Sequence, residues 1–287
     1  MEPIRTVGLI SKPKIQRATE IVTGLLRWLE ERGVGYRCDA QTAHYVGGDV
    51  PFFDREAVPD GTQLVIVLGG DGTLLSAARA IGARNIPLFA VNLGGLGFLT
   101  AITVEELYPE LERAFRGEHR IGRRRMLDCE LIRDGSIIGS YSALNDIVIT
   151  KTMIARMIDL KTFVDNHFVS VFKADGLIIS TPTGSTAYSL SAGGPIIFPS
   201  VSCICLTPIC PHMLTNRPVI VSDTSVIQID SYSDDGTFLT IDGQVGEPIS
   251  KGDRIICRSS AKTINLIRPP RMLFFDVLRE KLKWGER

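Results

Sequence analysis

The sequence predicts an α/β N-terminal domain with an open parallel sheet, followed by a mainly β C-terminal domain. Short apolar runs alternate with segments of helical periodicity in the first part of the chain, which is typical of parallel sheets covered by helices. Short segments separated by turn signals follow, which is typical of antiparallel β structure. A chain of 287 residues also exceeds the usual size of one domain. We therefore expect an α/β domain at 1–125, joined by a C-terminal helix at 270–287, and a β-rich domain at 126–269.

Strands and helices are expected to alternate through the α/β domain. Residues 6–11 read as a strand, and residues 16–32 carry apolar side chains at helical spacing. Residues 63–68 and 87–92 are short apolar runs suited to buried parallel strands, with a helix expected between them at 73–81. Helical crossovers between strands are what a parallel sheet requires.

Helix and turn signals mark the rest of the chain. Thr103, followed three residues later by Glu106, has the pattern of a capping box and predicts a helix that ends near Gly117. A last helix is expected over 273–284, after a pair of prolines. The turn signals between the short segments are Asp134-Gly135, Asp165-Asn166, Asp234-Asp235-Gly236 and Asp242-Gly243.

Charge and hydropathy argue against polyanion and membrane partners. Thirty-two basic and 32 acidic side chains cancel, so no overall positive field attracts nucleic acid or an anionic membrane surface. No apolar run approaches the length that spans a bilayer, and the first five residues lead into a strand pattern rather than a secretion signal. We expect a cytoplasmic protein that binds neither nucleic acid nor membranes.

The six cysteines are few and scattered, which argues against a disulfide framework. Cys203, Cys205 and Cys210, together with His212, could form a metal set or pack as small apolar side chains. Their spacing fits no common zinc pattern and they follow one another in an apolar, strand-like stretch, which favours packing. The sequence therefore identifies no metal-binding residues.

A glycine-rich turn, Gly69-Gly70-Asp71-Gly72, joins a strand to a helix and is suited to phosphate. Glycines permit positive φ and close backbone approach, and the first free N–H groups of a helix point at bound anions. The carboxylate of Asp71 would repel phosphate, so its presence suggests contact with a metal ion on the phosphates or with a hydroxyl about to be phosphorylated. The alternative is an aspartate that only caps the helix.

A second glycine turn, 92–97, follows the next predicted strand. Ligands of open α/β sheets gather at the carboxyl ends of the strands, so we expect the two turns to frame one cleft, although the second could be only a tight turn. The turn after the first strand, 11–14, lacks the G-x-G-x-x-G pattern, so a nucleotide would not bind in Rossmann fashion.

The stretch 175–195 is dense in hydroxyl groups. A strand is expected to end at Ser180, and Ser185 or Thr186 can cap a short helix that Gly193 ends. One cap does not need so many Ser and Thr side chains, so ligand binding is favoured over a capped connecting helix. The pair Asn145-Asp146, just before an apolar run, reads by itself as a turn.

Together these motifs resemble the NAD kinase family. The turn at 69–73 alone is shared with diacylglycerol-type lipid kinases and, in looser form, with phosphofructokinases. Four further segments make the resemblance specific, and they occur in the family's order: 92–99, 144–146, 175–195 and 211–218. The resemblance runs from residue 64 to about residue 244, which is most of the chain.

The resemblance implies phosphoryl transfer from ATP to the 2′-hydroxyl of the adenosine ribose of NAD, which gives NADP. Asp71 would be the general base, and Asn145 and Asp146 would bind the adenosine portion. Asp175 would take the nicotinamide amide. The implied NAD-binding residues are Asp71, Gly72, Asn145, Asp146, Arg156, Lys173, Asp175, Thr186, Ala187, Tyr188, Ser189, Leu190, Ser191 and Gln244. The effect of Lys173 on the choice between NAD and NADH stays open, and a solvent-facing Arg156 is equally plausible.

The resemblance also implies a divalent metal ion, Mg²⁺ by the chemistry of phosphoryl transfer, and a homodimer or homotetramer. The phosphoryl donor could be ATP, another triphosphate or polyphosphate. A lipid kinase and a noncatalytic dinucleotide sensor are the competing interpretations. The neutral charge and the hydroxyl-rich stretch argue against the former, and the acidic group at position 71 argues against the latter.

Overall fold

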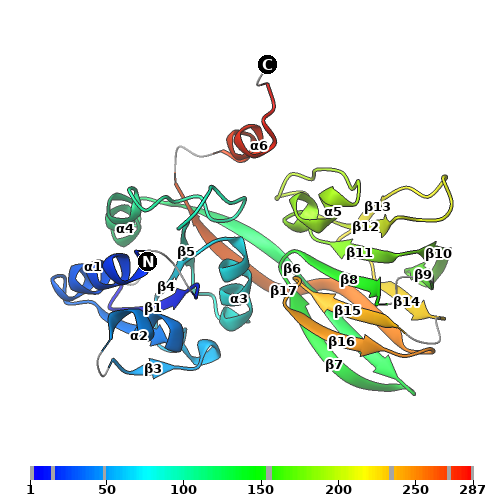
Figure 1. The fold of residues 1–287 in the computed structure, drawn as a ribbon, viewed down its shortest axis with the longest axis horizontal. Coiled ribbons are helices and arrows are strands. Elements are labelled where there is room, and N and C mark those ends of the chain that lie inside the picture. The colour runs from blue at the N-terminus through cyan, green and yellow to red at the C-terminus, as the bar shows by residue number, and fades with distance from the viewer. Residues whose placement is uncertain are drawn as a thin grey trace. The chain divides into compact units, whose positions relative to one another are not determined.

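The computed structural model describes residues 3–13, 17–47, 50–152, 157–232, 236–269 and 273–285. The chain forms two compact units, residues 1–123 with 264–287 and residues 124–263 (Figure 1). The first unit is α/β and the second is mainly antiparallel β, so the predicted fold class is confirmed. None of the helices in the described part of the chain combines the length and the apolar character that crossing a membrane requires.

A parallel sheet forms the centre of the first unit, in the strand order β5-β4-β1-β2-β3. Its strands are β1 (Thr6–Ser11), β2 (Gly35–Asp39), β3 (Phe52–Phe53), β4 (Leu64–Leu68) and β5 (Leu88–Val91). All the residues of β4 and β5 are buried. A continuous apolar run is what a parallel strand needs when both faces of its sheet are covered.

Four of the described helices pack on this sheet: α1 (Ala18–Glu30), α2 (Ala40–Val46), α3 (Asp71–Ile81) and α4 (Leu107–Phe115). The unit also contains the 3₁₀ helix η1 (Arg55–Ala57) and, near the end of the chain, helix α6 (Phe274–Leu282). Leu9 and Ile66 point to one face of the sheet, where they share an apolar core with α1, α2 and α4. Helix α3 packs on the strands too and begins directly at Asp71, two residues earlier than the sequence predicts.

The predicted helix after Thr103 is confirmed, but it starts later. The Glu106 carboxylate accepts a hydrogen bond from the Thr103 N–H at 3.0 Å, which is half of a capping box. Residues 104–106 form a turn, and α4 begins only at Leu107. Helix α2 was not predicted, because residues 40–46 have no clear apolar periodicity.

The second unit is a sandwich of two sheets with one apolar core between them. One sheet has the order β13-β12-β11-β8-β15-β16, with antiparallel pairing throughout. Its strands are β8 (Asp146–Lys151), β11 (Gly176–Ser180), β12 (Cys203–Ile209), β13 (Val219–Ser222), β15 (Thr237–Ile241) and β16 (Val245–Ile249). The other sheet contains β6 (Arg120–Arg133), β7 (Ser136–Ala143), β9 (Ile158–Val164), β10 (His167–Ala174), β14 (Ile227–Ser231) and β17 (Arg254–Arg268).

Burial alternates along β14 and β15, as expected for strands with one face in the core. A 3₁₀ turn, η2 (Gly184–Thr186), and the short helix α5 (Tyr188–Ser191) lie beside the β11–β13 end of the first of these sheets (Figure 1). These two short elements carry most of the hydroxyl side chains of the stretch 175–195.

The core of the first unit gives a test of the parallel sheet. Replacing the fully buried Ile66 of β4 by alanine should lower the free energy of unfolding by about 2–5 kcal/mol, because transfer energy is lost and a cavity remains. The matched change at Ile121, which is 41% exposed in the same unit, should cost less than about 1 kcal/mol. Urea unfolding followed by circular dichroism measures both. Equal losses at the two positions would contradict the burial of β4.

Candidate functional site

The Asp71 carboxylate is held by the backbone of the second glycine turn. Its Oδ2 accepts a hydrogen bond from the Phe98 N–H at 2.9 Å, and its Oδ1 accepts from the N–H groups of Leu99 at 3.1 Å and Thr100 at 3.0 Å. The Thr100 hydroxyl also donates to Oδ1, at 3.0 Å. The two glycine turns therefore meet through this side chain at the carboxyl ends of β4 and β5, whereas the expected cleft between them stays a prediction.

Asp71 does not act as a helix cap. The N-cap of α3 is Gly70, and the hydrogen bonds that Asp71 accepts come from residues 98–100 rather than from the first turn of its own helix. The Oδ1 atom accepts three hydrogen bonds, whereas Oδ2 accepts one. Since each carboxylate oxygen has two lone pairs, Oδ2 retains room for one more donor, such as a substrate hydroxyl.

The first glycine turn does not use the positive φ that glycine permits. None of Gly69, Gly70 and Gly72 has a positive φ, and Gly70 is extended at φ −101° and ψ −170°. The need for glycine is steric instead. A Cβ on Gly69 would lie 2.4 Å from the Thr73 hydroxyl oxygen, whereas at Gly70 the corresponding space is open to an approaching ligand.

The second turn is organised by Asn92, which is 6% exposed. Its Nδ2 donates to the Gly95 carbonyl at 2.7 Å and to the Thr100 hydroxyl at 2.9 Å. Gly97 allows the closest approach, since a Cβ there would lie 2.2 Å from the Asp71 Oδ1. A larger residue at 97 would push the loop away from the carboxylate.

Arg268 is a charged neighbour of Asp71 that no local sequence pattern marks. It lies at the end of β17, is 9% exposed and donates to the Phe98 carbonyl at 3.4 Å. Burial lowers the pKa of its guanidinium, and the negative charge of Asp71 opposes part of this shift. Arg268 thus adds positive charge and a hydrogen bond to the loop that holds Asp71.

A pocket of about 430 Å³ lies in the second unit. Its lining residues are Asn145, Asp146, Val148, Thr150, Ala187, Tyr188, Thr240, Asp242 and Gly243. Asp146, Val148 and Thr150 alternate along β8 and so share one face of the sheet. Thr240 of the neighbouring β15 is paired with Val148 and extends the same face. The pocket therefore has a sheet as its floor and the start of α5 as a wall.

Two carboxylates meet at the rim of this floor. Asp242 accepts backbone hydrogen bonds from Leu144 at 3.1 Å, Asn145 at 2.8 Å and Asp146 at 3.3 Å. Asp146 itself is 5% exposed. Burial, assisted by the negative charge of Asp242, raises the pKa of Asp146 to about 7. Near neutral pH, Asp146 can therefore exchange a proton and serve as either donor or acceptor.

Asn145 presents an unsatisfied acceptor. Its Oδ1 is buried and has no hydrogen-bond partner among the described residues. Its backbone carbonyl is fixed by the Thr181 N–H at 2.9 Å, and the backbone of Asn145 would be only 2.1 Å from a Cβ on Gly184. A buried acceptor without a partner costs about 1–3 kcal/mol, so a ligand donor here would be favourable.

Of the predicted dinucleotide-binding residues, the pocket brings together Asn145, Asp146, Ala187 and Tyr188. Ala187 precedes α5. Tyr188, the first residue of α5, lines the pocket and is 45% exposed. Ser189 points elsewhere, because it is fully buried and its hydroxyl lies 2.9 Å from that of Thr207.

The other predicted residues lie outside the lining of this pocket. Thr186 donates to the Thr183 carbonyl at 3.3 Å, Leu190 is half-buried, and Ser191 is exposed at the end of α5. The predicted cap of this helix by Ser185 or Thr186 is wrong, since α5 starts without a side-chain cap. Gly193, with a φ of 85°, ends the turn after α5 as predicted.

The charged and amide residues are also spread out. Asp175 forms an ion pair with the Lys151 ammonium at 2.5 Å, and Lys173 and Gln244 are exposed. Gly72 is exposed in the first turn of α3. Arg156 lies outside the described residues, so its predicted contact is not placed.

Sequence reasoning missed several lining residues. Val148, Thr150 and Thr240 read only as strand residues, and nothing local distinguishes them. Asp242 and Gly243 were recognised as a turn, and the positive φ of Asp242, 50°, agrees with that. The role of the Asp242 carboxylate depends on the pairing of β8 with β15, which no local pattern shows.

The cysteine-rich stretch is mostly apolar packing. Cys203 and Cys205 are buried on β12 beside Ile197, which confirms the expected packing for these two. Cys210 is exposed, so the expectation is wrong there. In the part of the chain that the structure describes, no group of three or more His, Cys, Asp or Glu residues is arranged to hold a metal ion.

Comparison with known proteins places both units in one family. The family model of the ATP-NAD kinase N-terminal domain matches residues 7–119, and that of the ATP-NAD kinase C-terminal domain matches residues 144–269. The NAD kinase of Solibacter usitatus is 66% identical to this chain over 288 residues, which cover 100% of this chain and 100% of the relative. The NAD kinase of Koribacter versatilis is 48% identical over 285 residues, which cover 99% of this chain and 100% of the relative.

Two solved structures resemble the whole chain. Yeast NADH kinase complexed with NADH has a TM-score of 0.93 and 27% identity, over 100% of this chain and 90% of the yeast chain. An NAD kinase from Archaeoglobus fulgidus in complex with ATP has a TM-score of 0.77 and 25% identity, over 97% of this chain and 98% of that one.

The raised pKa of Asp146 makes stability depend on pH. An aspartate has a pKa near 3.8 when unfolded and Asp146 has one of about 7 when folded, so its contribution is fully present below about pH 4 and is lost as the pH rises through 7. Between pH 5 and pH 8 the wild type should lose roughly 2–3 kcal/mol relative to Asp146→Asn. Urea unfolding of both proteins at the two pH values measures this. A constant difference between them would contradict the buried acid.

Proposed function

The chain belongs to the NAD kinase family, and on that premise we propose that it transfers the γ-phosphoryl group of ATP to the 2′-hydroxyl of the adenosine ribose of NAD. The observation that carries the proposal is the Asp71 carboxylate, fixed by three backbone N–H groups with one acceptor site left open. In the reaction the ribose oxygen forms a bond to the γ-phosphorus while the bond from that phosphorus to the β-phosphate oxygen breaks. The products are NADP and ADP.

Asp71 is the proposed general base. The ribose 2′-hydroxyl donates to Oδ2, the oxygen that accepts only the Phe98 N–H, and its proton passes to this carboxylate as the new bond forms. The transition state of phosphoryl transfer is loose, so positioning and charge neutralisation lower most of the barrier. Proton acceptance by a positioned group adds about 10²- to 10⁴-fold in rate.

The second unit is the proposed dinucleotide-binding domain. Its pocket of about 430 Å³ is within the usual range for small-molecule sites and suits the adenosine portion of NAD. The unpartnered Oδ1 of Asn145 can accept from the adenine amino group, and Asp146 can bind a ribose hydroxyl. The Tyr188 ring offers an apolar face at the wall.

The remaining predicted contacts stay proposals that rest on the family resemblance. Thr186, Ala187, Tyr188 and Ser191 would line the adenine and nicotinamide sites, with Ser189 and Leu190 supporting them. Gly72, Asp175 and Gln244 would complete the dinucleotide site. Lys173 would influence the choice between NAD and NADH, and Arg156 would reach the substrate.

Mg²⁺ is the proposed metal, carried mainly by the phosphates of ATP. Mg²⁺ usually keeps several waters and binds one or two carboxylates together with substrate phosphates, so it does not need a protein cage. Asp71 is not assigned as a ligand of this ion, because the open position on its Oδ2 is given to the ribose 2′-hydroxyl. When bound, the ion neutralises part of the phosphate charge.

We propose a homodimer or homotetramer that works in the cytosol. Strand β10 ends its sheet and exposes Phe168, Val169 and Val171, an apolar edge suited to a second copy of the chain. All six cysteines are free thiols, as is usual in a reducing compartment.

Asp71→Asn tests the general base. The amide oxygen can replace Oδ1 and keep its three donors, so only the Phe98 N–H loses its acceptor and the variant should fold. With NAD, ATP and Mg²⁺, kcat for NADP formation should fall about 10²- to 10⁴-fold while the Kd for NAD changes little.

The matched control is Asp60→Asn, an exposed carboxylate in the same unit, which should leave kcat unchanged. Wild-type protein that binds NAD without forming NADP would be a sensor, and wild-type protein that does neither would support a lipid kinase. An Asp71→Asn enzyme as fast as the wild type would remove Asp71 from the mechanism.

Asn145→Asp tests the adenosine pocket. The change keeps the shape of the side chain but adds a negative charge beside Asp146 and Asp242, so KM for NAD should rise at least about tenfold with a smaller change in kcat. Asn85→Asp, which keeps the acceptor for Asn265 on the surface of the first unit, is the control. Steady-state kinetics of NADP formation measure both. An unchanged KM for NAD would argue against this pocket as the adenosine site.

A further inference from the structure

The strand order of the first unit singles out the ends of β1 and β4. The chain passes from β1 to β2 and β3 on one side, then returns to place β4 and β5 on the other side of β1. The order therefore reverses between β1 and β4. In open α/β sheets, ligands bind outside the carboxyl ends of the strands at such a switch point. The end of β4 is the Asp71 turn, and the end of β1 is Ser11-Lys12.

Lys12 lies directly beside the glycine turn. Its backbone N–H donates to the carbonyl of Leu68, the last residue of β4, at 2.9 Å. A Cβ on Gly69 would lie 3.0 Å from the Lys12 Cβ, so the two backbones approach closely. The side chain of Lys12 thus starts next to the turn that carries Asp71, the proposed general base.

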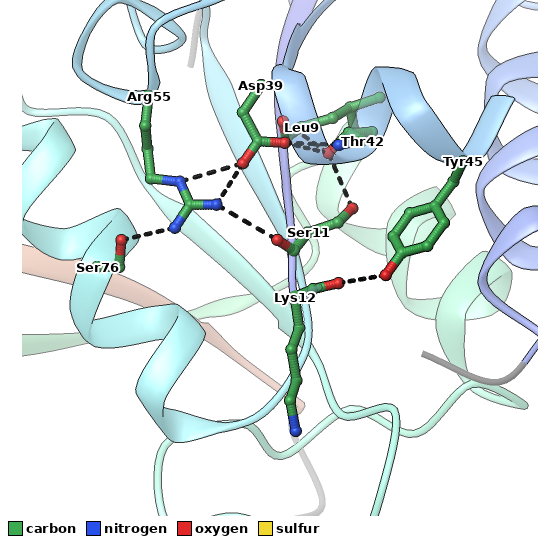
Figure 2. Close-up of polar contacts among 8 residues, drawn as sticks. All are labelled: Leu9, Ser11, Lys12, Asp39, Thr42, Tyr45, Arg55 and Ser76. Atoms are coloured by element: carbon green, nitrogen blue, oxygen red, sulfur yellow. Dashed lines mark hydrogen bonds and ion pairs between the residues drawn. The ribbon is translucent and has the colours of Figure 1, made fainter. Parts of the chain in front are cut away.

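A polar network fixes the backbone from which Lys12 projects (Figure 2). The Tyr45 hydroxyl donates to the Lys12 carbonyl at 2.7 Å. The Thr42 hydroxyl lies 2.8 Å from the Ser11 hydroxyl oxygen, and an Arg55 Nη2 lies 3.4 Å from the Ser11 carbonyl. Helix α2, through Thr42 and Tyr45, and η1, through Arg55, both hold the end of β1.

The same network also contacts the helix that carries Asp71. Arg55 donates to the Ser76 hydroxyl of α3 at 2.9 Å. It donates as well to the Asp39 carboxylate, from Nε at 3.1 Å and from Nη2 at 2.5 Å. Asp39 is 2% exposed, and its other oxygen accepts from the Thr42 N–H at 2.8 Å. Asp39 and Arg55 are thus positioning residues that link β2, η1 and α3.

These contacts leave Lys12 as the available cation. The positive charge of Arg55 compensates the negative charge of Asp39, so Asp39 does not attract Lys12 strongly. Lys12 is exposed, and within the described part of the chain its ammonium has neither a hydrogen bond nor an ion pair. Figure 2 shows its side chain extending away from the network. A lysine with a fixed backbone and a free ammonium is suited to a mobile anionic ligand.

We propose that Lys12 binds the phosphates of the donor nucleotide at the β1–β4 switch point. Lysine binds phosphate as a compact point charge with three donors, and here it places a positive charge beside the glycine turn. This inference rests on the proposed function, in which the γ-phosphoryl group is transferred to the hydroxyl that Asp71 binds. Lys12 makes no covalent bond and transfers no proton.

Kinetics of Lys12→Met test the proposal, because methionine keeps the apolar stem and removes the charge. KM for ATP should rise tenfold or more, whereas KM for NAD and the thermal unfolding midpoint stay unchanged. Lys12→Arg should restore KM for ATP to within about threefold of the wild type, since the charge returns. Lys281→Met, an exposed lysine on α6 of the same unit, should behave as the wild type.

Two kinetic outcomes overturn the proposal. One is a KM for ATP within twofold of the wild type in Lys12→Met, and the other is an equal rise of KM for ATP and for NAD. Calorimetric binding of ATP without NAD separates this inference from the proposed function. Wild-type protein that forms no NADP but binds ATP tenfold more tightly than Lys12→Met would refute the kinase activity and support the role of Lys12. ATP binding that is equal in both proteins would refute that role.

Discussion

The hydrogen bonds from residues 98–100 to the Asp71 carboxylate are the interaction on which the candidate active site depends. A carboxylate in a glycine turn would repel phosphate and move freely if it were unpaired. Three backbone N–H groups and one hydroxyl instead fix its orientation and leave a single acceptor position on Oδ2. The same bonds join the ends of β4 and β5, and Arg268 reinforces the loop through the Phe98 carbonyl. One side chain therefore sets both the structure of this edge and its chemistry.

In the second unit, one sheet covers the apolar core with one face and presents polar groups to the pocket with the other. Alternation along β8 directs Ile147 and Ile149 into the sandwich and Asp146, Val148 and Thr150 into the pocket. Burial of Asp146 next to Asp242 has a cost, seen in the raised pKa of Asp146. Acidic side chains with a perturbed pKa are common at functional sites, where a ligand can supply the missing partner. The unpartnered Oδ1 of Asn145 belongs to the same pattern.

Features that depend on neighbours in sequence were predictable. The apolar run 64–68 and the glycines after it predicted the strand, the turn and the helix around Asp71, and β1 matches its predicted range. Features that depend on distant residues were not. Arg268 lies about 200 residues from Asp71, and Asp242 bonds to residues 144–146 only because β15 pairs with β8. None of Gly69, Gly70 and Gly72 uses the positive φ that glycine permits, and close packing against Thr73 accounts for the glycine at position 69.

Amide hydrogen exchange resolved to single residues measures whether residues 98–100 hold the Asp71 carboxylate. The N–H groups of Phe98, Leu99 and Thr100 should exchange slowly in the wild type and at least about tenfold faster in Asp71→Ala, because each loses its acceptor. The Gly69 N–H, which donates to the Val91 carbonyl at 3.0 Å, should be unaffected. Rapid exchange of the three amides in the wild type, or equal rates in both proteins, would contradict the account.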